Sequence, residues 1–423
     1  MPKLSHYDVI IVGGGTAGCA AAYTAGKSGL KTLLVEKNIN LGGSITSGLV
    51  IPAMNTSKKQ INTDFFNALI KELHSLKGQV TYLDNPGWFN PELCKVALDR
   101  LMAKSNVEVL FDTRVIGVNI VKKELNRLTL SSNMLSVYIG ASNIVDATGN
   151  CEVGVLAGCG FLQNKNEFQP VSLRFEMAGV DLETFGQWLL DYDKDRNVTS
   201  VQVIDGQTHL STAYTSEKGT KWALEPLFKD AVDGKVLKNE DRKYFQLFTI
   251  PNMPNSVAFN CPRVCLGFDV DPLDNSQISK ALIEAREGIV RLANFCKIYF
   301  PGFEKSYISN IADALGVRVS RRIKGKYIYT IDDLKSGKKF KNPVLISNYP
   351  IDVHSNNGKS VLEYTEQEYQ LPVEALMSAD YKNLFVAGRC LSADFYAQAA
   401  LRIQPSCFSM GEGVAKHIAG ISG

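Results

Sequence analysis

The chain has 423 residues, and its 46 lysines and arginines against 43 acids give a formal net charge of +3. With 45% hydrophobic and 21% charged residues, it has the composition of a folded globular protein rather than a disordered or collagen-like one. Its length suggests two interleaved domains. The basic residues are spread among an almost equal number of acids instead of forming a stripe, so we expect no nucleic-acid partner.

The nine cysteines are scattered, without a CxxC pair or a cysteine and histidine spacing suited to zinc. This pattern predicts reduced thiols in a cytoplasmic protein and no metal site. The apolar run near the N-terminus is short and interrupted by glycines. We therefore expect neither a signal peptide nor a membrane span.

Residues 7–37, YDVIIVGGGTAGCAAAYTAGKSGLKTLLVEK, have the pattern of strand, tight turn, helix and strand. Gly13, Gly15 and Gly18 form a GxGxxG motif, which allows a sharp turn, close approach of the backbone to a pyrophosphate, and tight packing of helix on strand. The helix N-terminus then faces the phosphates. Glu36 ends the second strand, where its carboxylate can accept hydrogen bonds from ribose hydroxyls. The segment predicts a dinucleotide site.

A second glycine pair in LGGSITSG (residues 41–48) suits a loop that runs along a long, bent cofactor, which favours FAD over NAD. Here the sequence resembles the FAD-dependent oxidoreductases of the glutathione-reductase structural type, in the branch of the fumarate reductase and succinate dehydrogenase flavoproteins. VEVLFDTRVIGV (107–118) resembles the strand that brackets the adenine in that class. IVDATGNCEVGVLAG (144–158) and NLFVAGRC (383–390) resemble its later strand-turn motifs, which lie near the FAD.

This resemblance implies an α/β fold with a Rossmann-like FAD-binding domain (βαβ, parallel sheet) and an inserted α+β substrate or cap domain. The expected division is 1–165 and 366–423 for the FAD-binding domain and 166–365 for the cap. The FAD is expected to be non-covalent, because residues 44–55 contain no histidine where the succinate dehydrogenase group carries its covalent one. The expected FAD-binding residues are Gly13, Gly15, Thr16, Ala17, Gly18, Glu36, Lys37, Gly42, Gly43, Ser44, Thr46, Arg114, Val115, Ala147, Thr148, Gly149, Gly388, Arg389, Gln404 and Ser406.

The middle of the chain has no second GxGxxG and no CxxC pair, so we expect no separate NAD(P)H domain. It contains strand-like runs and one amphipathic run at 276–300 that predicts a helix. Residues 260–264, 316–334, 349–354 and 369–376 resemble recurring motifs of a group of FAD-dependent oxidoreductases whose substrates are mostly unassigned.

Three residues are the catalytic candidates. His354 ends the run YPIDVH, and Asp352 shares its face of the strand and could orient the imidazole; the alternative is a capped surface histidine. Arg321 and Arg322 point to opposite faces, so at most one reaches a site; we take Arg322 as the candidate to hold a carboxylate or donate a proton, against an ordinary ion pair. Arg402 could line the substrate side or anchor a loop. Arg174 and Arg263 are weaker candidates.

The C-terminal segment predicts a helix from about Ser406, with Pro405 near its first turn. Its N-terminus could stabilise negative charge at the N1–C2=O edge of reduced flavin. Arg389 stands where the wider class carries an acid, so it could reach the pyrophosphate or the substrate side. A truncation near residue 380 is expected to abolish FAD binding.

The predicted function is that of an FAD-dependent oxidoreductase acting on a small organic metabolite at a CH–CH, CH–OH or CH–NH unit. The sequence leaves open the substrate, the direction, the electron donor or acceptor and the oligomeric state. Two alternatives remain: an RNA-modification flavoprotein, whose N-terminal motif also reads GGGxAGC, and a flavoprotein subunit of an electron-transfer complex.

Overall fold

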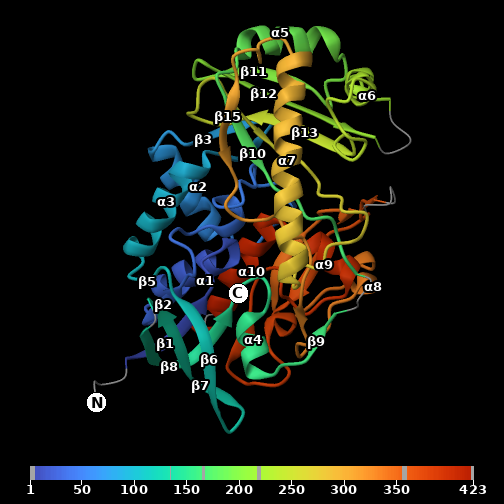
Figure 1. Cartoon of the computed structure of the whole chain (residues 1–423). Helices are drawn as coiled ribbons and strands as arrows, with labels where there is room; N and C mark the ends of the chain where they lie inside the picture. Colours follow the sequence, from blue (N-terminus) through green and yellow to red (C-terminus); the bar gives the residue numbers. More distant parts are fainter. Residues whose placement is uncertain (1–4, 134, 164–166, 217–220, 355–359, 421–423) are drawn as a thin grey trace.

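Two hydrophobic cores organise the chain. The elements that surround the second core lie above those that surround the first in Figure 1. The computed structural model describes residues 5–133, 135–163, 167–216, 221–354 and 360–420. The second core is formed by Leu49 and side chains between residues 171 and 312, and the first by side chains from both ends of the chain. Within the described ranges, no helix combines the length and the apolar character needed to cross a bilayer.

The first core surrounds a seven-stranded sheet in the order β5-β2-β1-β8-β7-β6, with β21 paired to β8. β1, β2, β5, β8 and β21 run parallel, whereas β6, β7 and β8 form an antiparallel extension. This arrangement confirms the predicted α/β fold. The strands are β1 (His6–Val12), β2 (Thr32–Val35), β5 (Glu108–Leu110), β6 (Arg114–Val121), β7 (Glu124–Ser132), β8 (Leu135–Asp146) and β21 (Leu384–Val386).

The run 107–118 forms two strands, β5 and β6, instead of the single predicted strand. Asp112 lies between them with a φ of 46°. Aspartate tolerates this left-handed conformation better than most residues, and it breaks the extended chain. The sequence prediction was therefore wrong about the continuity of this strand.

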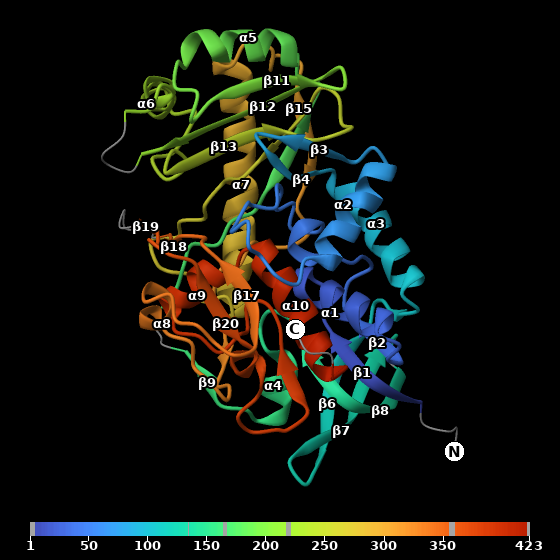
Figure 2. The same ribbon diagram turned by 180° about the vertical axis from the view of Figure 1, so that it is seen from behind.

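Helices α1 (Thr16–Lys27) and α10 (Gln404–Ile418) pack against each other beside this sheet (Figure 2). Their contact faces carry small residues, and the α1 alanines are buried. The predicted C-terminal helix is confirmed, but it begins two residues earlier than Ser406. α2 (Asp64–Ser75), α3 (Pro91–Lys104) and the hairpin β3 (Gln79–Tyr82) and β4 (Asn85–Phe89) lie next to them, and a short helical turn, η1 (Gly43–Ile45), follows β2.

The second core lies under a six-stranded antiparallel sheet in the order β11-β12-β13-β14-β10-β15. Its centre is aromatic, with the rings of Phe175 and Phe259 stacked at 4.2 Å. The predicted helix at 276–300 is α7 (Asn275–Tyr299), which begins where the side chain of Asp274 accepts hydrogen bonds from two backbone amides. The other elements are β10 (Phe175–Ala178), α5 (Leu182–Tyr192), β11 (Ser200–Ile204), β12 (Gln207–Thr215), α6 (Glu225–Asp233), β13 (Tyr244–Thr249), β14 (Ser256–Phe259) and β15 (Tyr307–Ile311).

The segment after β15 returns to the first core. Val319 and the buried apolar side chains that follow it in sequence pack with the nucleotide-binding half. Several of these side chains fall within the range 166–365 that was predicted as the cap, so the boundaries at 165 and 365 stay a prediction. The remaining elements are α4 (Glu152–Ala157), β9 (Phe161–Leu162), β16 (Arg322–Ile323), α8 (Ile331–Lys335), β17 (Pro343–Ser347), β18 (Ile351–Val353), β19 (Val361–Glu363), β20 (Tyr369–Pro372), η2 (Val373–Leu376) and α9 (Phe395–Leu401).

Candidate active site

The turn after β1 requires glycine. Gly13 has a φ of +99°, and a β-carbon there would lie 2.7 Å from the carbonyl oxygen of Ala147, at the end of β8. The second glycine pair lies on this turn, because the Gly42 amide donates to the Gly14 carbonyl at 2.7 Å. The two glycine motifs therefore form one surface of bare backbone.

Among the glycines of this surface, Gly15 is the one with open space where a side chain would project. A β-carbon there would meet no atom within 4 Å. The residue precedes the first turn of α1, and no side chain caps that helix end. Thr16 and Ser44 bring their hydroxyls to 3.1 Å from each other beside it. Free backbone amides under open space fit a pyrophosphate.

The carboxylate of Glu36 is buried at the end of β2. Its two oxygens accept hydrogen bonds from the amides of Gly14 (2.6 Å) and Asn38 (2.8 Å). Each oxygen has a further lone pair that could accept a ribose hydroxyl. The amide of Thr113 donates to the Glu36 carbonyl, so exposed Arg114 at the start of β6 lies close by.

Two expected cofactor residues are held by protein groups. Lys37 forms a half-exposed ion pair with Glu152 at 3.1 Å. Arg389 donates to the carbonyls of Gly149 (2.9 Å) and Val317 and to the side chain of Asn150 (2.8 Å). Burial lowers its pKa. The guanidinium of Arg389 thus ties the turn after β8 to two other segments.

The N-terminus of α10 approaches the loop that follows the second glycine pair. Gln404 donates from Nε2 to the carbonyl of Val50. The Gln404 Oε1 and the buried Ser406 hydroxyl have no hydrogen-bond partner among the described residues. Gly388, with a φ of +83°, would place a β-carbon 3.1 Å from that of Ala17. Unpaired polar atoms buried at the start of this helix fit a polar ligand.

Residues 169–174 contact several segments that are distant in sequence from the glycine motifs and from one another. The side-chain oxygen of Gln169 accepts the His354 amide at 3.2 Å, and the Pro170 carbonyl accepts the Arg318 guanidinium. The backbone of Ser172 forms isolated antiparallel β-bridges with the backbones of Arg263 and Gly316. One extended segment therefore aligns side chains that are far apart in sequence.

The side chains of Arg402, Asp352, His354 and Arg263 form a chain of contacts. Asp352 Oδ2 lies 3.2 Å from Arg402 Nη2 and 3.3 Å from His354 Nε2. Arg263 Nη2 lies 3.0 Å from His354 Nδ1. A neutral imidazole protonated at Nε2 satisfies both contacts, which assigns the tautomer.

The electrostatics support this assignment. Burial and the charge of Arg318 lower the pKa of His354 to about 3. Burial alone would raise the pKa of Asp352, but the contact with His354 and the charges of Arg402 and Arg318 hold it below its usual range. His354 is therefore neutral and Asp352 ionised at neutral pH.

Arg318 and Arg174 add two partly buried guanidinium groups. Burial, with repulsion from Arg402 and Arg263, lowers the pKa of Arg318 to about 9, and burial lowers that of Arg174 to about 10. Arg174 donates to the carbonyls of Leu49 and Ile51. Sequence reasoning missed Arg318. The signal that could have found it is the alternation of faces along an extended GVRVSRR run (residues 316–322). In such a run Arg318 lies on the same face as the chosen candidate, Arg322.

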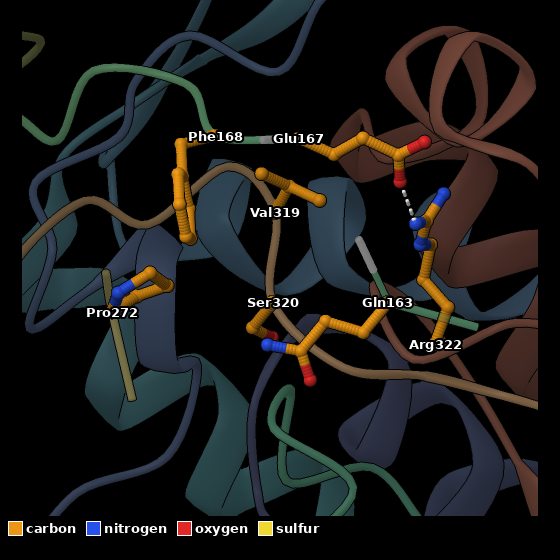
Figure 3. Close-up of a pocket in the computed structure, with 7 residues that line it drawn as sticks. All are labelled: Gln163, Glu167, Phe168, Pro272, Val319, Ser320 and Arg322. Atoms are coloured by element: carbon orange, nitrogen blue, oxygen red, sulfur yellow. Dashed lines mark hydrogen bonds and ion pairs between the residues drawn. The ribbon is translucent and has the colours of Figure 1, made fainter. Parts of the chain in front are cut away.

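Arg322 lies apart from these contacts. It forms an ion pair with Glu167 and donates to the carbonyls of Leu162 (3.2 Å) and Ala393 (3.3 Å). The pair borders a cavity of about 10 Å³ (Figure 3), room for about one water. The structure thus brings His354 and Arg402 together and gives Arg322 other partners.

A cavity of about 380 Å³ adjoins the loop that follows the second glycine pair. Thr46, Ser47 and Leu49 line it from this loop. Its ionisable lining is mostly acidic, with Glu92, Lys95, Glu176 and Asp313. Its volume is that of a small-molecule site.

A parallel sheet whose first turn and helix form a bare glycine surface defines a Rossmann-type dinucleotide-binding protein. A family model described as FAD dependent oxidoreductase matches residues 8–421. The chain therefore belongs to the FAD-dependent oxidoreductase family; it is an enzyme, and its cofactor is FAD.

Curated relatives match parts of the chain. A thiamine thiazole synthase of Saccharolobus islandicus is 29% identical over 150 residues, which are 34% of this chain and 55% of that protein. A digeranylgeranylglycerophospholipid reductase of Methanococcus vannielii is 25% identical over 183 residues, 42% of this chain and 46% of that protein. The chain thus spans about half the length of these relatives.

Two solved structures share the fold. A geranylgeranyl bacteriochlorophyll reductase-like protein from Thermoplasma acidophilum has a TM-score of 0.50 at 15% identity, covering 99% of this chain and 79% of that one. A flavin-dependent brominase has a TM-score of 0.50 at 13% identity, covering 98% and 79%. At these identities the similarity shows the fold alone.

Proposed function

We propose that this enzyme uses non-covalent FAD to move a hydride to or from a small organic metabolite at a CH–CH, CH–OH or CH–NH unit. One observation carries the proposal. Arg402, which contacts Asp352, lies two residues before Gln404, which begins α10. The polar network of the substrate side is therefore continuous in the chain with the helix end that contacts the loop after the second glycine pair.

On the cofactor side, we assign the pyrophosphate to the open space above Gly15 and the adenosine ribose to Glu36. We also assign to the rest of the FAD the oxygens of Gln404 and Ser406 at the start of α10, which have no hydrogen-bond partner among the described residues. When bound, FAD supplies the hydride acceptor or donor. The glutathione-reductase structural type and the fumarate reductase branch remain part of this proposal, supported by the second glycine pair.

On the substrate side, the role of the protein residues is to orient the substrate and to hold fixed charges next to it. Oxidation removes one hydride and one proton from the substrate, and reduction returns both. Arg402 is held by Asp352, so its guanidinium is fixed in direction. Because both ring nitrogens of His354 are engaged, the imidazole must release Arg263 or Asp352 before it can accept or donate a proton. In the structure as it stands, His354 is a positioning residue.

The first test is the state of the flavin. We expect the purified protein to be yellow and acid precipitation to release its FAD into the supernatant. Flavin colour that stayed in the pellet would show covalent attachment. A colourless protein that could not be reconstituted with FAD would contradict the assigned cofactor surface.

The second test is anaerobic screening of small metabolites for bleaching of the bound flavin, with reoxidation of the reduced protein screened in parallel. We expect at least one metabolite class to exchange a hydride with the flavin. The matched control is Gly15→Ala, which should lack FAD. If bulk RNA bound tightly while no metabolite changed the flavin, a role in RNA modification would replace this proposal.

A further inference from the structure

We infer that the cavity of about 380 Å³ beside the loop at residues 46–49 binds a small aliphatic amine in its ammonium form, with the carboxylate of Glu176 as its main partner. The lining of this cavity does not include Arg402, Asp352 or His354. The inference goes beyond the proposed function, because amine binding is measured without any turnover of the flavin.

The cavity lies where elements of the two hydrophobic cores meet. Thr46 and Ser47 line it from the loop that follows the second glycine pair, and Glu92 and Lys95 line it from near the start of α3. Its other wall comes from β10, which carries Glu176, and from β15, two strands of the six-stranded sheet. Small-molecule sites are common at such junctions between two packed units.

The alternation of side chains along β10 places Glu176 on this wall. Its neighbours Phe175 and Met177 belong to the second core, so the side chain between them points to the opposite face of the sheet. Ala258, the β14 residue that pairs with Glu176, belongs to the first core. The carboxylate is therefore held between the two cores, where Glu176 is 1% exposed.

One oxygen of this buried carboxylate has no partner. Oε2 accepts a hydrogen bond from Nδ2 of Asn310, another lining residue, at 3.2 Å. Oε1 has no hydrogen-bond partner among the described residues. Burial raises the pKa of Glu176, although the hydrogen bond from Asn310 opposes this. A buried carboxylate oxygen without a donor is costly, so a ligand gains most there if it brings an N–H donor and a positive charge.

The charged side chains of the lining leave an excess of negative charge. Lys95 donates to both carboxylate oxygens of Glu92, at 2.7 and 2.9 Å, so these two charges cancel. Glu176 and the exposed Asp313 remain. The balance stays negative even if Arg174 is counted, whose guanidinium donates to two carbonyls of the neighbouring loop. The cavity therefore favours a cation over an anion.

The rest of the lining suits a short hydrocarbon chain that ends in an ammonium group. The hydroxyl of Thr46 already donates to the Leu41 carbonyl and that of Ser47 to the Asn40 side chain, so both can only accept from a ligand. A primary ammonium group brings three N–H donors to such a wall. The apolar lining residues are Leu49, Met253, Ile311 and Ala312.

The test is calorimetric titration of the FAD-loaded full chain near neutral pH and at constant ionic strength. The three probes share an n-pentyl chain. Pentylamine carries the charge and the N–H donors, trimethylpentylammonium carries the charge without a donor, and pentanol carries a donor without the charge. We expect pentylamine to bind at least about tenfold more tightly than either of the others, because only it makes a charge-assisted hydrogen bond.

The main variant is Glu176→Gln, which keeps the shape of the side chain and removes its charge. The matched control is Glu287→Gln, at an exposed position of α7. We expect Glu176→Gln to lose at least about tenfold in pentylamine affinity and the control to lose none. Asp313→Asn, at an exposed position, should lose about two- to threefold. If Glu176→Gln fails to fold, Asp313→Asn and the comparison of the three probes still decide.

Equal affinity for pentylamine and either of the other probes would overturn the inference, and an ordered water on Oε1 of Glu176 would then be the better explanation of that oxygen. Unchanged affinity in a folded Glu176→Gln protein would also overturn it, because the amine would bind elsewhere. Failure of the proposed function looks different. In that case no metabolite exchanges a hydride with the flavin, while pentylamine still binds and Glu176→Gln still weakens it.

Discussion

Gly411 of α10 faces the carbonyl oxygen of Ala17 in α1, and a β-carbon at position 411 would lie 2.1 Å from that oxygen. The two helices can approach this closely because neither carries a large side chain at the crossing. Since α1 starts at the glycine surface and α10 starts beside the polar network, their contact fixes the two sides of the cofactor site relative to each other.

The Gly411→Ala variant should therefore be destabilised. The added methyl forces the helices apart, an overpacking that costs about 1–3 kcal/mol in the free energy of unfolding. Gly186→Ala in α5 is the control, because its β-carbon would meet atoms no closer than 3.5 Å, and alanine favours a helix. Urea unfolding of both variants is the measurement. Equal stability of Gly411→Ala and wild type would show that the helix crossing adapts without cost.

Gly15→Ala should separate cofactor binding from folding. The backbone at Gly15 has a φ of −76°, which alanine tolerates, and its β-carbon meets nothing within 4 Å. The apoprotein should thus keep its unfolding midpoint, while FAD affinity should fall at least about a hundredfold because the methyl occupies the pyrophosphate position. FAD titration and thermal unfolding of the apoprotein check both parts. Normal FAD content in the variant would contradict the assigned phosphate position.

Local patterns predicted the nucleotide-binding half well. Glycine spacing, an alanine-rich helix and a following acid are all encoded within residues 7–37, so strand, turn and helix could be predicted without tertiary information. The break at Asp112 escaped prediction because a left-handed residue inside an apolar run leaves no periodicity signal.

The substrate side was harder, because its contacts are long-range. Asp352 and His354, at the end of β18, were paired correctly because they are close in sequence, but the contact of Asp352 with Arg402 joins residues 50 positions apart. Arg322 was preferred because of its residue type and because it lies in the motif at residues 316–334. Its ion pair with Glu167 depends on the pairing of β16 with β9, which no local pattern reveals.

The pH dependence of stability should reveal the neutral His354. Its pKa is lowered from 6.5 to about 3 in the folded protein, first by burial and then by Arg318. Between these values the unfolded chain binds the extra proton, so this group's contribution is complete above pH 6.5 and is lost as pH falls. The free energy of unfolding should drop by up to about 1.4 kcal/mol per pH unit from this group.

Urea unfolding of wild type and His354→Gln, from neutral pH to about pH 5, measures this slope. The variant should have the shallower dependence. Asp352 stays ionised throughout this range because its pKa is held below the usual one, and buried His209, whose pKa is also lowered, contributes equally to both proteins. Parallel slopes in the two proteins would mean that His354 is not held neutral.

Arg322→Met decides between a catalytic and a structural arginine. Its side chain is 3% exposed and its guanidinium is paired with Glu167, whereas neighbouring Arg321 makes a single long contact with the Asn150 carbonyl at 3.5 Å. Removing this nearly buried guanidinium breaks the ion pair with Glu167 and leaves the carbonyls of Leu162 and Ala393 without their side-chain donor, so Arg322→Met should lose about 3 kcal/mol of unfolding free energy. Arg321→Met should lose much less.

The rates of flavin reduction in the Arg322→Met and Arg321→Met variants should be alike. Because Arg322 contacts none of Arg402, Asp352 or His354 in the described structure, the rate of flavin reduction by an identified substrate should stay within about twofold of wild type in any Arg322→Met protein that remains folded. Stopped-flow reduction at a temperature well below the variant's midpoint measures this rate. A large loss of rate at unchanged stability would return Arg322 to the catalytic role that its motif suggested, and would require the substrate to reach the small cavity beside Glu167.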